Sequence, residues 1–218
     1  MVKNILSIDF DIIMYPCIKL YNDQVPGDEN PTVLWNNLEE RFDIDHFLTY
    51  DARLYIEIVK CVKEAVANGA KLIQIEDHDK LVDWLKGFDD EFYNDEENKY
   101  NITNIDFHHD LMYRKLDKSA ITRFDKYNCS DWLGYLYLKK KAQAITWVKA
   151  PNSIPYCNDF GEIKDLEILS KSEIGILNKT NKFDYVFLCL SPQWVPYKFK
   201  HLYDLIIELF KEEDDQII

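Results

Sequence analysis

Short apolar segments alternate along this chain with segments of helical periodicity, and this alternation constrains the fold more than any other feature. Five segments have the composition of buried strands and cover residues 3–8, 70–75, 101–105, 143–148 and 185–190. The clearest helical spacing runs from Asp51 to Asn68, and Gly69 follows where a C-terminal cap is expected. Strands that alternate with helices predict a three-layer α/β/α fold with a mainly parallel central sheet.

The sequence predicts a single domain over residues 1–218, because 47% hydrophobic residues suffice for a sizeable core. Residues 12–50 form a predicted irregular insertion, with a turn at Val25-Pro26-Gly27-Asp28 and a short helix from Leu34 to Phe42. An excursion straight after the first strand is a candidate substrate-binding loop. Helices are also expected after residue 78, stopping at Gly87, and over residues 132–138 and 198–210, whereas residues 165–176 are ambiguous.

The charge balance narrows the class of partner. A formal charge of −13, from 39 acidic and 26 basic residues, disfavours nucleic acid and favours a cationic ligand or a metal. No apolar run reaches membrane-spanning length and no signal-peptide pattern opens the chain, so a cytoplasmic protein without membrane contact is expected. Five cysteines at scattered spacings predict neither a disulfide framework nor a thiolate zinc site.

Acidic residues and histidines follow three of the predicted strands. The first run is Ser7-Ile8-Asp9-Phe10-Asp11, the second is Ile75-Glu76-Asp77-His78, and the third is Asp106-Phe107-His108-His109-Asp110. Carboxyl ends of parallel strands meet at one edge of a sheet, where ligands bind. The candidate metal ligands are Asp9, Asp11, His78, Asp106, His108 and Asp110. Carboxylates with one or two histidines suit Mn²⁺, and six ligands suit two ions about 3.5–4 Å apart.

Two of these runs also have a simpler explanation. Asp9 and Asp11 can cap a turn after a strand, and His78 can be an exposed histidine balanced by its acidic neighbours. The third run is harder to explain without a metal, because it places two histidines and two aspartates within five residues at a strand end.

At these residues the sequence resembles the arginase, or ureohydrolase, family. The family's D-x-H-x-D segment is similar to residues 106–110, its S-x-D-x-D segment to residues 7–11, and its lone metal histidine to His78 after Asp77. The branch it resembles most is the atypical peptide arginases, which convert arginine side chains of a ribosomally made precursor peptide to ornithine. D-W-L-G-Y-L at 131–136 and L-S-P-Q-W-V-P at 190–196 add to that likeness.

The resemblance implies a manganese-dependent hydrolase that acts on the C–N bonds of an amidine and releases urea from an arginine-containing precursor peptide. It implies two Mn²⁺ ions that share Asp9 and Asp106, with His78 and Asp110 completing one ligand set and Asp11 and His108 the other. The fold it implies is arginase-like with a permuted motif order, because S-x-D-x-D here precedes D-x-H-x-D instead of following it.

Two further departures concern substrate binding. Ordinary arginases carry a guanidinium-binding glutamate on a late strand, but Cys189-Leu190-Ser191-Pro192 has none, so Glu76 is the candidate substitute. His109 is the candidate proton-transferring residue, because of the remaining histidines it lies closest in sequence to the cluster. The family's loop for the free α-carboxylate has no counterpart here, which fits a peptidyl arginine.

Two other functions stay open. The chain could be another binuclear metallohydrolase, acting on a different C–N bond or on a phosphoester, although six glycines in the whole chain offer little material for a phosphate cradle. It could also be a non-catalytic metal-binding or scaffold protein, which the missing late-strand glutamate favours. Neither the sequence of the precursor peptide nor the oligomeric state follows from these residues.

Overall fold

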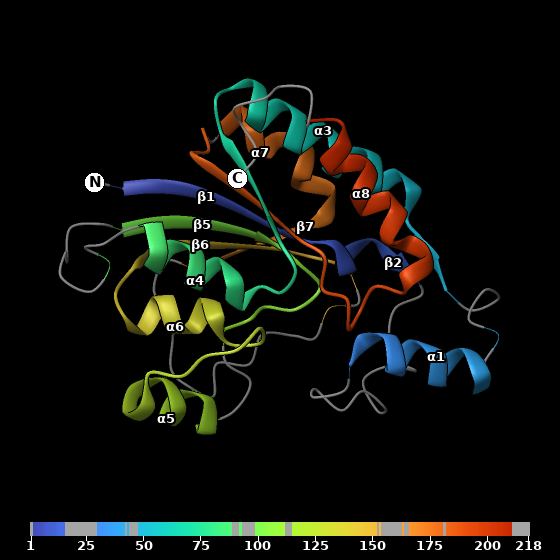
Figure 1. Cartoon of the computed structure of the whole chain (residues 1–218). Coiled ribbons are helices and arrows are strands. Elements are labelled where there is room, and N and C mark those ends of the chain that lie inside the picture. The colour runs from blue at the N-terminus through green and yellow to red at the C-terminus, as the bar shows by residue number, and fades with distance from the viewer. Residues whose placement is uncertain are drawn as a thin grey trace.

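The central element is a six-stranded sheet in which every strand pairs in parallel with its neighbours, in the order β4-β8-β1-β5-β6-β7 (Figure 1). The computed structural model describes residues 2–15, 30–41, 43, 48–88, 92, 99–111, 115–151, 153, 163, 166–180 and 182–210. The strands are β1 (Val2–Asp9), β4 (Lys71–Ile75), β5 (Lys99–Ile105), β6 (Ala142–Lys149), β7 (Leu166–Ser170) and β8 (Tyr185–Cys189). All five predicted strands are confirmed, and β7 begins the region that was ambiguous in sequence.

Helices cover both faces of the sheet (Figure 1). One face carries α3 (Ala52–Ala67), α7 (Ile174–Thr180) and α8 (Lys200–Glu208); the other carries α4 (Asp79–Phe88), α5 (Lys115–Phe124) and α6 (Trp132–Leu138). Two separate cores result, because successive side chains of a strand point to opposite faces. Leu6 and Ile8 of β1 belong to the core under α3 and α8, whereas Ile5 belongs to the core under α4 and α6. The three-layer α/β/α prediction is therefore confirmed.

Local signals explain both boundaries of α3. The Asp51 carboxylate accepts a hydrogen bond from Leu54 N at 3.0 Å and caps α3, and Gly69, with φ of 94°, follows its end. The predicted stop at Gly87 is wrong, because α4 continues to Phe88. A glycine costs a helix only about 1 kcal/mol relative to alanine, which the buried apolar face of α4 can offset.

The predicted insertion after β1 contains regular elements. A 3₁₀ turn (η1, Phe10–Ile13) leads into β2 (Met14–Tyr15), which pairs antiparallel with β3 (Thr49–Tyr50). Helix α1 (Pro31–Arg41) lies between them in sequence, beyond the carboxyl ends of the strands (Figure 1). The predicted turn at residues 25–28 lies outside the described residues. Within the described ranges, no helix combines the length and apolar character needed to cross a bilayer.

Candidate metal centre

The sheet topology brings the three acidic runs to one edge. Strand β1 lies between β5 and β8, and β8 pairs in turn with β4, so the ends of all three motif strands lie within four adjacent strands. Ile8 is in register with Ile105, and Asp9 with Cys189. All six predicted ligands meet beyond these strand ends, and five of them are buried: Asp9, Asp11, His78, Asp106 and Asp110.

His78 is surrounded by three carboxylates. Its Nδ1 atom lies 3.1 Å from Oδ2 of Asp110 and 3.4 Å from Oδ2 of both Asp9 and Asp106. A ring nitrogen can make one good hydrogen bond, so it cannot satisfy three carboxylates in this way. Convergence of one nitrogen and several carboxylate oxygens is the arrangement expected of ligands around a cation.

A second group is formed by Asp11, Asp106 and His108. His108 Nδ1 lies 3.0 Å from Oδ2 of Asp11 and 3.9 Å from Oδ1 of Asp106. Neither carboxylate oxygen of Asp11 accepts a hydrogen bond from the described residues, although Asp11 is fully buried. Among the described residues the His108 ring is thus the group closest to balancing the buried Asp11 charge, and a metal ion between the two would satisfy both side chains. Asp106 belongs to this group and to the group of His78 and Asp110, so it lies between two possible ion positions.

Neighbouring side chains orient the candidate ligands. Four such contacts connect Ser7 Oγ with His78 Nε2 (3.1 Å), Trp132 Nε1 with Asp110 Oδ2 (2.7 Å), Asn104 Nδ2 with Asp106 Oδ2 (3.1 Å), and Ser191 Oγ with Asp9 Oδ2 (2.6 Å). Such outer partners fix the orientation and basicity of metal ligands. None was identified from the sequence, because a serine, an asparagine or a tryptophan has no motif that marks it as a partner of a distant carboxylate.

Two residues at the site adopt left-handed backbone conformations that non-glycine residues rarely use. Asp110 has φ of 51° and Ser191 has φ of 49°. The Asp110 carbonyl accepts a hydrogen bond from Gly134 N at the start of α6, and the Ser191 carbonyl accepts from Trp194 N and Val195 N. Strain of this kind clusters at functional sites, where surrounding contacts hold it in place.

The electrostatics of the cluster favour added positive charge. Burial, together with the charge of Asp11, raises the pKa of Asp9 to about 7, and burial beside three other aspartates raises the pKa of Asp106 well above its ordinary value. Burial would lower the pKa of His108, but the adjacent Asp11 carboxylate outweighs it and raises that pKa to about 9. Bound cations would relieve this accumulation of carboxylates and hold the ligands deprotonated.

A pocket of about 80 Å³ opens onto the cluster. Beside the candidate ligands Asp9, His78, His108 and Asp110, it is lined by Asp77, Cys129, Ser130, Ser191, Gln193 and Trp194. The Trp194 ring lies 4.9 Å from the His108 ring. Cys189 offers its sulfur within 4.8 Å of ligand atoms of Asp9 and His78, which adds a possible ligand that its scattered spacing in the sequence did not indicate.

The two predicted catalytic residues lie apart from this pocket's described lining. Glu76 is exposed and lines a neighbouring pocket. His109 is buried, accepts a hydrogen bond from Leu111 N at 3.0 Å and packs edge-on against Trp147. Burial lowers the pKa of His109 to about 4, so it is neutral at physiological pH. Glu76 is the candidate chosen from the sequence over its neighbour Asp77, but Asp77 is the one of the two that lines the metal pocket.

Comparison of the chain with protein-family models, with curated proteins and with solved structures finds no match, so the argument for function starts from the geometry of this site.

Proposed function

We propose that the chain is a manganese-dependent hydrolase of the arginase type, which converts an arginine side chain of a peptide to ornithine and releases urea. The observation that supports the proposal most is that three motifs far apart in sequence meet at one sheet edge, where Asp106 belongs to two of the candidate ligand groups. The reversed motif order is no obstacle to it, because what the site requires is the adjacency of β1 and β5 in the sheet.

The donor set suits a pair of Mn²⁺ ions, since carboxylates and imidazoles are ligands that this ion accepts. His78 and Asp110 would hold one ion, Asp11 and His108 the other, and Asp9 and Asp106 would be shared. A metal pair in such a site activates water and stabilises the negative charge that develops during hydrolysis.

In this proposal the substrate guanidinium is bound by residues other than the candidate metal ligands. Asp77 lines the pocket, is half-buried and belongs to none of the candidate ligand groups. Its carboxylate is hydrogen-bonded to the Gln193 side chain, and in this proposal it also pairs with the cationic substrate. The Trp194 indole forms part of the same wall, and planar guanidinium groups stack on aromatic faces. Together they would fix the plane of the group over the cluster and exclude bulk water from one side of it.

A phosphoester substrate fits the pocket less well. Its described lining contains carboxylates, two histidines, hydroxyls and an amide but neither lysine nor arginine. Bound phosphate ordinarily requires such cations or a cradle of backbone N–H groups. The carboxylate of Asp77 at the mouth would instead repel a phosphate.

The proposal is tested by incubating metal-free and Mn²⁺-loaded protein with arginine, agmatine and an arginine-containing peptide. We expect urea from the peptide only with Mn²⁺, together with the mass loss that accompanies conversion of the guanidino group to an amine. Absence of urea from all three substrates, with metal bound, would exclude the arginase activity. Release of phosphate from a generic phosphoester by the same sample would favour the phosphoesterase instead.

A further inference from the structure

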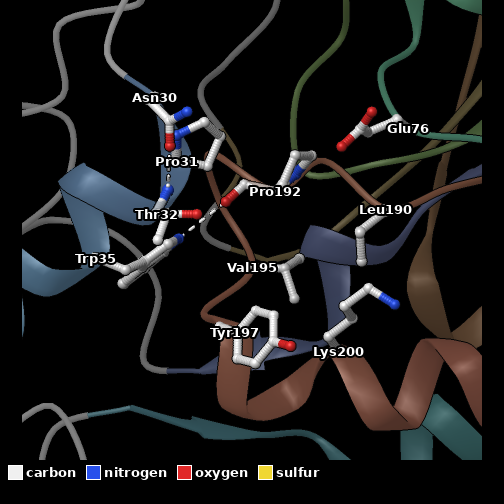
Figure 2. A pocket seen from close by; sticks show the side chains of 10 residues that line it. All are labelled: Asn30, Pro31, Thr32, Trp35, Glu76, Leu190, Pro192, Val195, Tyr197 and Lys200. Carbon is white, nitrogen blue, oxygen red and sulfur yellow. Dashed lines mark hydrogen bonds between the residues drawn. The ribbon is translucent and has the colours of Figure 1, made fainter.

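A second pocket, of about 240 Å³, is drawn in Figure 2, and residues that line it are chain neighbours of residues that line the metal pocket. The two pockets share their walls. In the turn after β8, Leu190, Pro192 and Val195 line the second pocket, whereas Ser191, Gln193 and Trp194 line the metal pocket. After β4, Glu76 likewise lines the second pocket and Asp77 lines the metal pocket. A molecule bound over the metal cluster therefore needs to extend only across this turn to enter the second pocket.

The second pocket has apolar walls and a polar margin. Its apolar lining consists of Pro31, Trp35, Leu190, Pro192, Val195 and Tyr197, drawn from α1, the turn after β8 and the segment that leads into α8 (Figure 2). Trp35 and Val195 are almost fully buried, whereas Tyr197 is 78% exposed and lies at the rim. Glu76 and Lys200 add one carboxylate and one ammonium group.

Several contacts hold these walls in place. The Trp35 indole N–H donates to the Pro192 carbonyl at 2.8 Å, which fastens α1 to the turn after β8 (Figure 2). Lys200 Nζ donates to Oδ1 of Asp204 at 2.6 Å, one helical turn along α8. The proline rings have few conformations to lose. A pocket that is already ordered binds an apolar group without a large ordering cost.

We propose that this pocket binds an apolar side chain of the substrate peptide, one or two residues from the arginine whose guanidinium enters the metal pocket. This inference rests on the proposed function for the placement of that arginine. Successive residues of an extended peptide advance by about 3.3 Å, so a near neighbour of the arginine can reach across a turn that is a single segment thick. Free arginine has no apolar side chain to place against the apolar walls, so these walls would favour a peptide with an apolar neighbour over the free amino acid.

Binding to non-reacting peptides tests the pocket separately from catalysis. The probes are two fluorescein-labelled, amidated seven-residue peptides with a central ornithine, one flanked on both sides by leucines and the other by glycines. We expect Mn²⁺-loaded protein to bind the leucine peptide about tenfold more tightly, because part of a leucine side chain leaves water. Fluorescence anisotropy gives both dissociation constants.

Two variants and a matched control test whether the preference for the leucine peptide arises in the second pocket. Thr32→Trp places a bulky ring into the pocket from the exposed start of α1, and Tyr197→Ala removes the exposed rim. We expect Thr32→Trp to abolish the preference for the leucine peptide and Tyr197→Ala to reduce it. Val33→Trp adds the same ring at a 51% exposed position on the same helix that does not line the pocket, and should keep the preference.

The outcomes separate the pocket from the activity. Equal affinity of the parent protein for the two peptides would overturn the proposal that the second pocket binds an apolar side chain. Retention of the preference for the leucine peptide by both variants would overturn it too. A preference that Thr32→Trp abolishes would support the pocket even where no urea is formed, in which case only the proposed function fails. Urea formation without any flank preference would leave the proposed function standing and exclude this pocket from substrate binding.

Discussion

Asp11 shows most clearly why the site calls for a cation. Its side chain is fully buried, neither of its oxygens accepts a hydrogen bond from the described residues, and His108 Nδ1 lies 3.0 Å from one of them. Folding has placed this carboxylate beside Asp9, whose pKa rises to about 7 because of burial and the Asp11 charge. The repulsion between these buried carboxylates destabilises the metal-free fold. A bound metal ion would remove that repulsion, and its relief would add to the free energy of metal binding.

Removing a ligand from each motif tests the cluster. We expect His108→Ala and Asp9→Ala both to lower the amount of Mn²⁺ that copurifies or rebinds, and to abolish urea formation, because each deletes a donor that the neighbouring groups cannot replace. Metal content is measured by elemental analysis after dialysis. His201→Ala, at an exposed histidine on α8, is the control and should bind metal normally. Unchanged metal content in both ligand variants would refute the assignment.

Substitutions of Asp77 and Glu76, the two acidic residues after β4, should lower activity to different extents. If Asp77 pairs with the guanidinium, Asp77→Asn should lower kcat/KM for an arginine peptide by about 10–100-fold, the usual effect of losing a charged hydrogen bond. Glu76→Gln should have a smaller effect, since Glu76 lines the neighbouring pocket. Bound Mn²⁺ should be unchanged in both variants. A larger loss from Glu76→Gln would restore Glu76 as the guanidinium-binding residue that its position beside His78 suggested.

The protonation of the cluster predicts how metal stabilisation varies with pH. The pKa of Asp9 is raised from 3.8 to about 7, so the metal-free folded state keeps a proton that the unfolded chain releases, and its stability falls as pH rises through that window. His108, with a pKa raised to about 9, acts in the same direction at higher pH. Mn²⁺ replaces these protons, so its increase of Tm should be small at pH 5.5 and larger at pH 8. Equal increases at both pH values would contradict this.

At the scale of elements, α6 connects the α4/α6 core to the metal centre. Trp132 at its first turn is fully buried and donates its indole N–H to Asp110 at 2.7 Å, and Gly134 N donates to the Asp110 carbonyl. These contacts hold Asp110 in its left-handed conformation, with φ of 51°. The helix thus orients Asp110, and its Trp132 ring also packs against the His78 ring, with 5.2 Å between the ring centroids.

Trp132→Phe keeps most of the packing volume and removes the donor. We expect Mn²⁺ affinity to fall by about 10–100-fold, as is usual when an outer partner of a ligand is lost. Isothermal titration calorimetry measures it. Trp84→Phe on α4 is the matched control, since the Trp84 ring packs against Tyr185 and Phe187 of β8. Equal affinity in the two variants would show that the indole donor does not position Asp110.

The elements differ in how well the sequence predicted them. The five strands were predictable because each is a short apolar run, and β8 is buried along its whole length. The edge strand β7 was ambiguous because its apolar residues, Leu166, Ile168 and Leu169, form neither a continuous run nor a strict alternation. Helix α5 was not predicted, since most residues of Lys115–Phe124 are polar and its helically spaced apolar residues, Leu116, Ala120, Ile121 and Phe124, are few.

The residues of the candidate site also differ in how well the sequence predicted them. Its six candidate ligands were found because carboxylates and histidines cluster visibly at strand ends. Ser7, Trp132 and Ser191 were not found, because their contacts depend on register and helix packing that no local pattern encodes. Which of Glu76 and Asp77 faces the cluster likewise depends on the backbone path after β4.

Across the whole molecule, the site exists only when the sheet is complete. β1 pairs with β5 and β8, which lie far along the chain, so the ligands meet only after these long-range pairings form. If the substrate is the proposed arginine-containing peptide, the net charge of −13 would attract it over long range. The position of each strand in the sheet decides which motifs meet, whatever their order in the sequence. Motifs in the reverse of the usual order can therefore still form one cluster.

The most direct test of the account is an anomalous diffraction measurement on crystals of the Mn²⁺-loaded protein, collected on both sides of the manganese absorption edge. We predict two manganese peaks among Asp9, Asp11, His78, Asp106, His108 and Asp110, separated by about 3.5–4 Å. Absence of any manganese peak at these residues, or peaks confined to other parts of the molecule, would contradict the binuclear centre on which the proposed hydrolase rests.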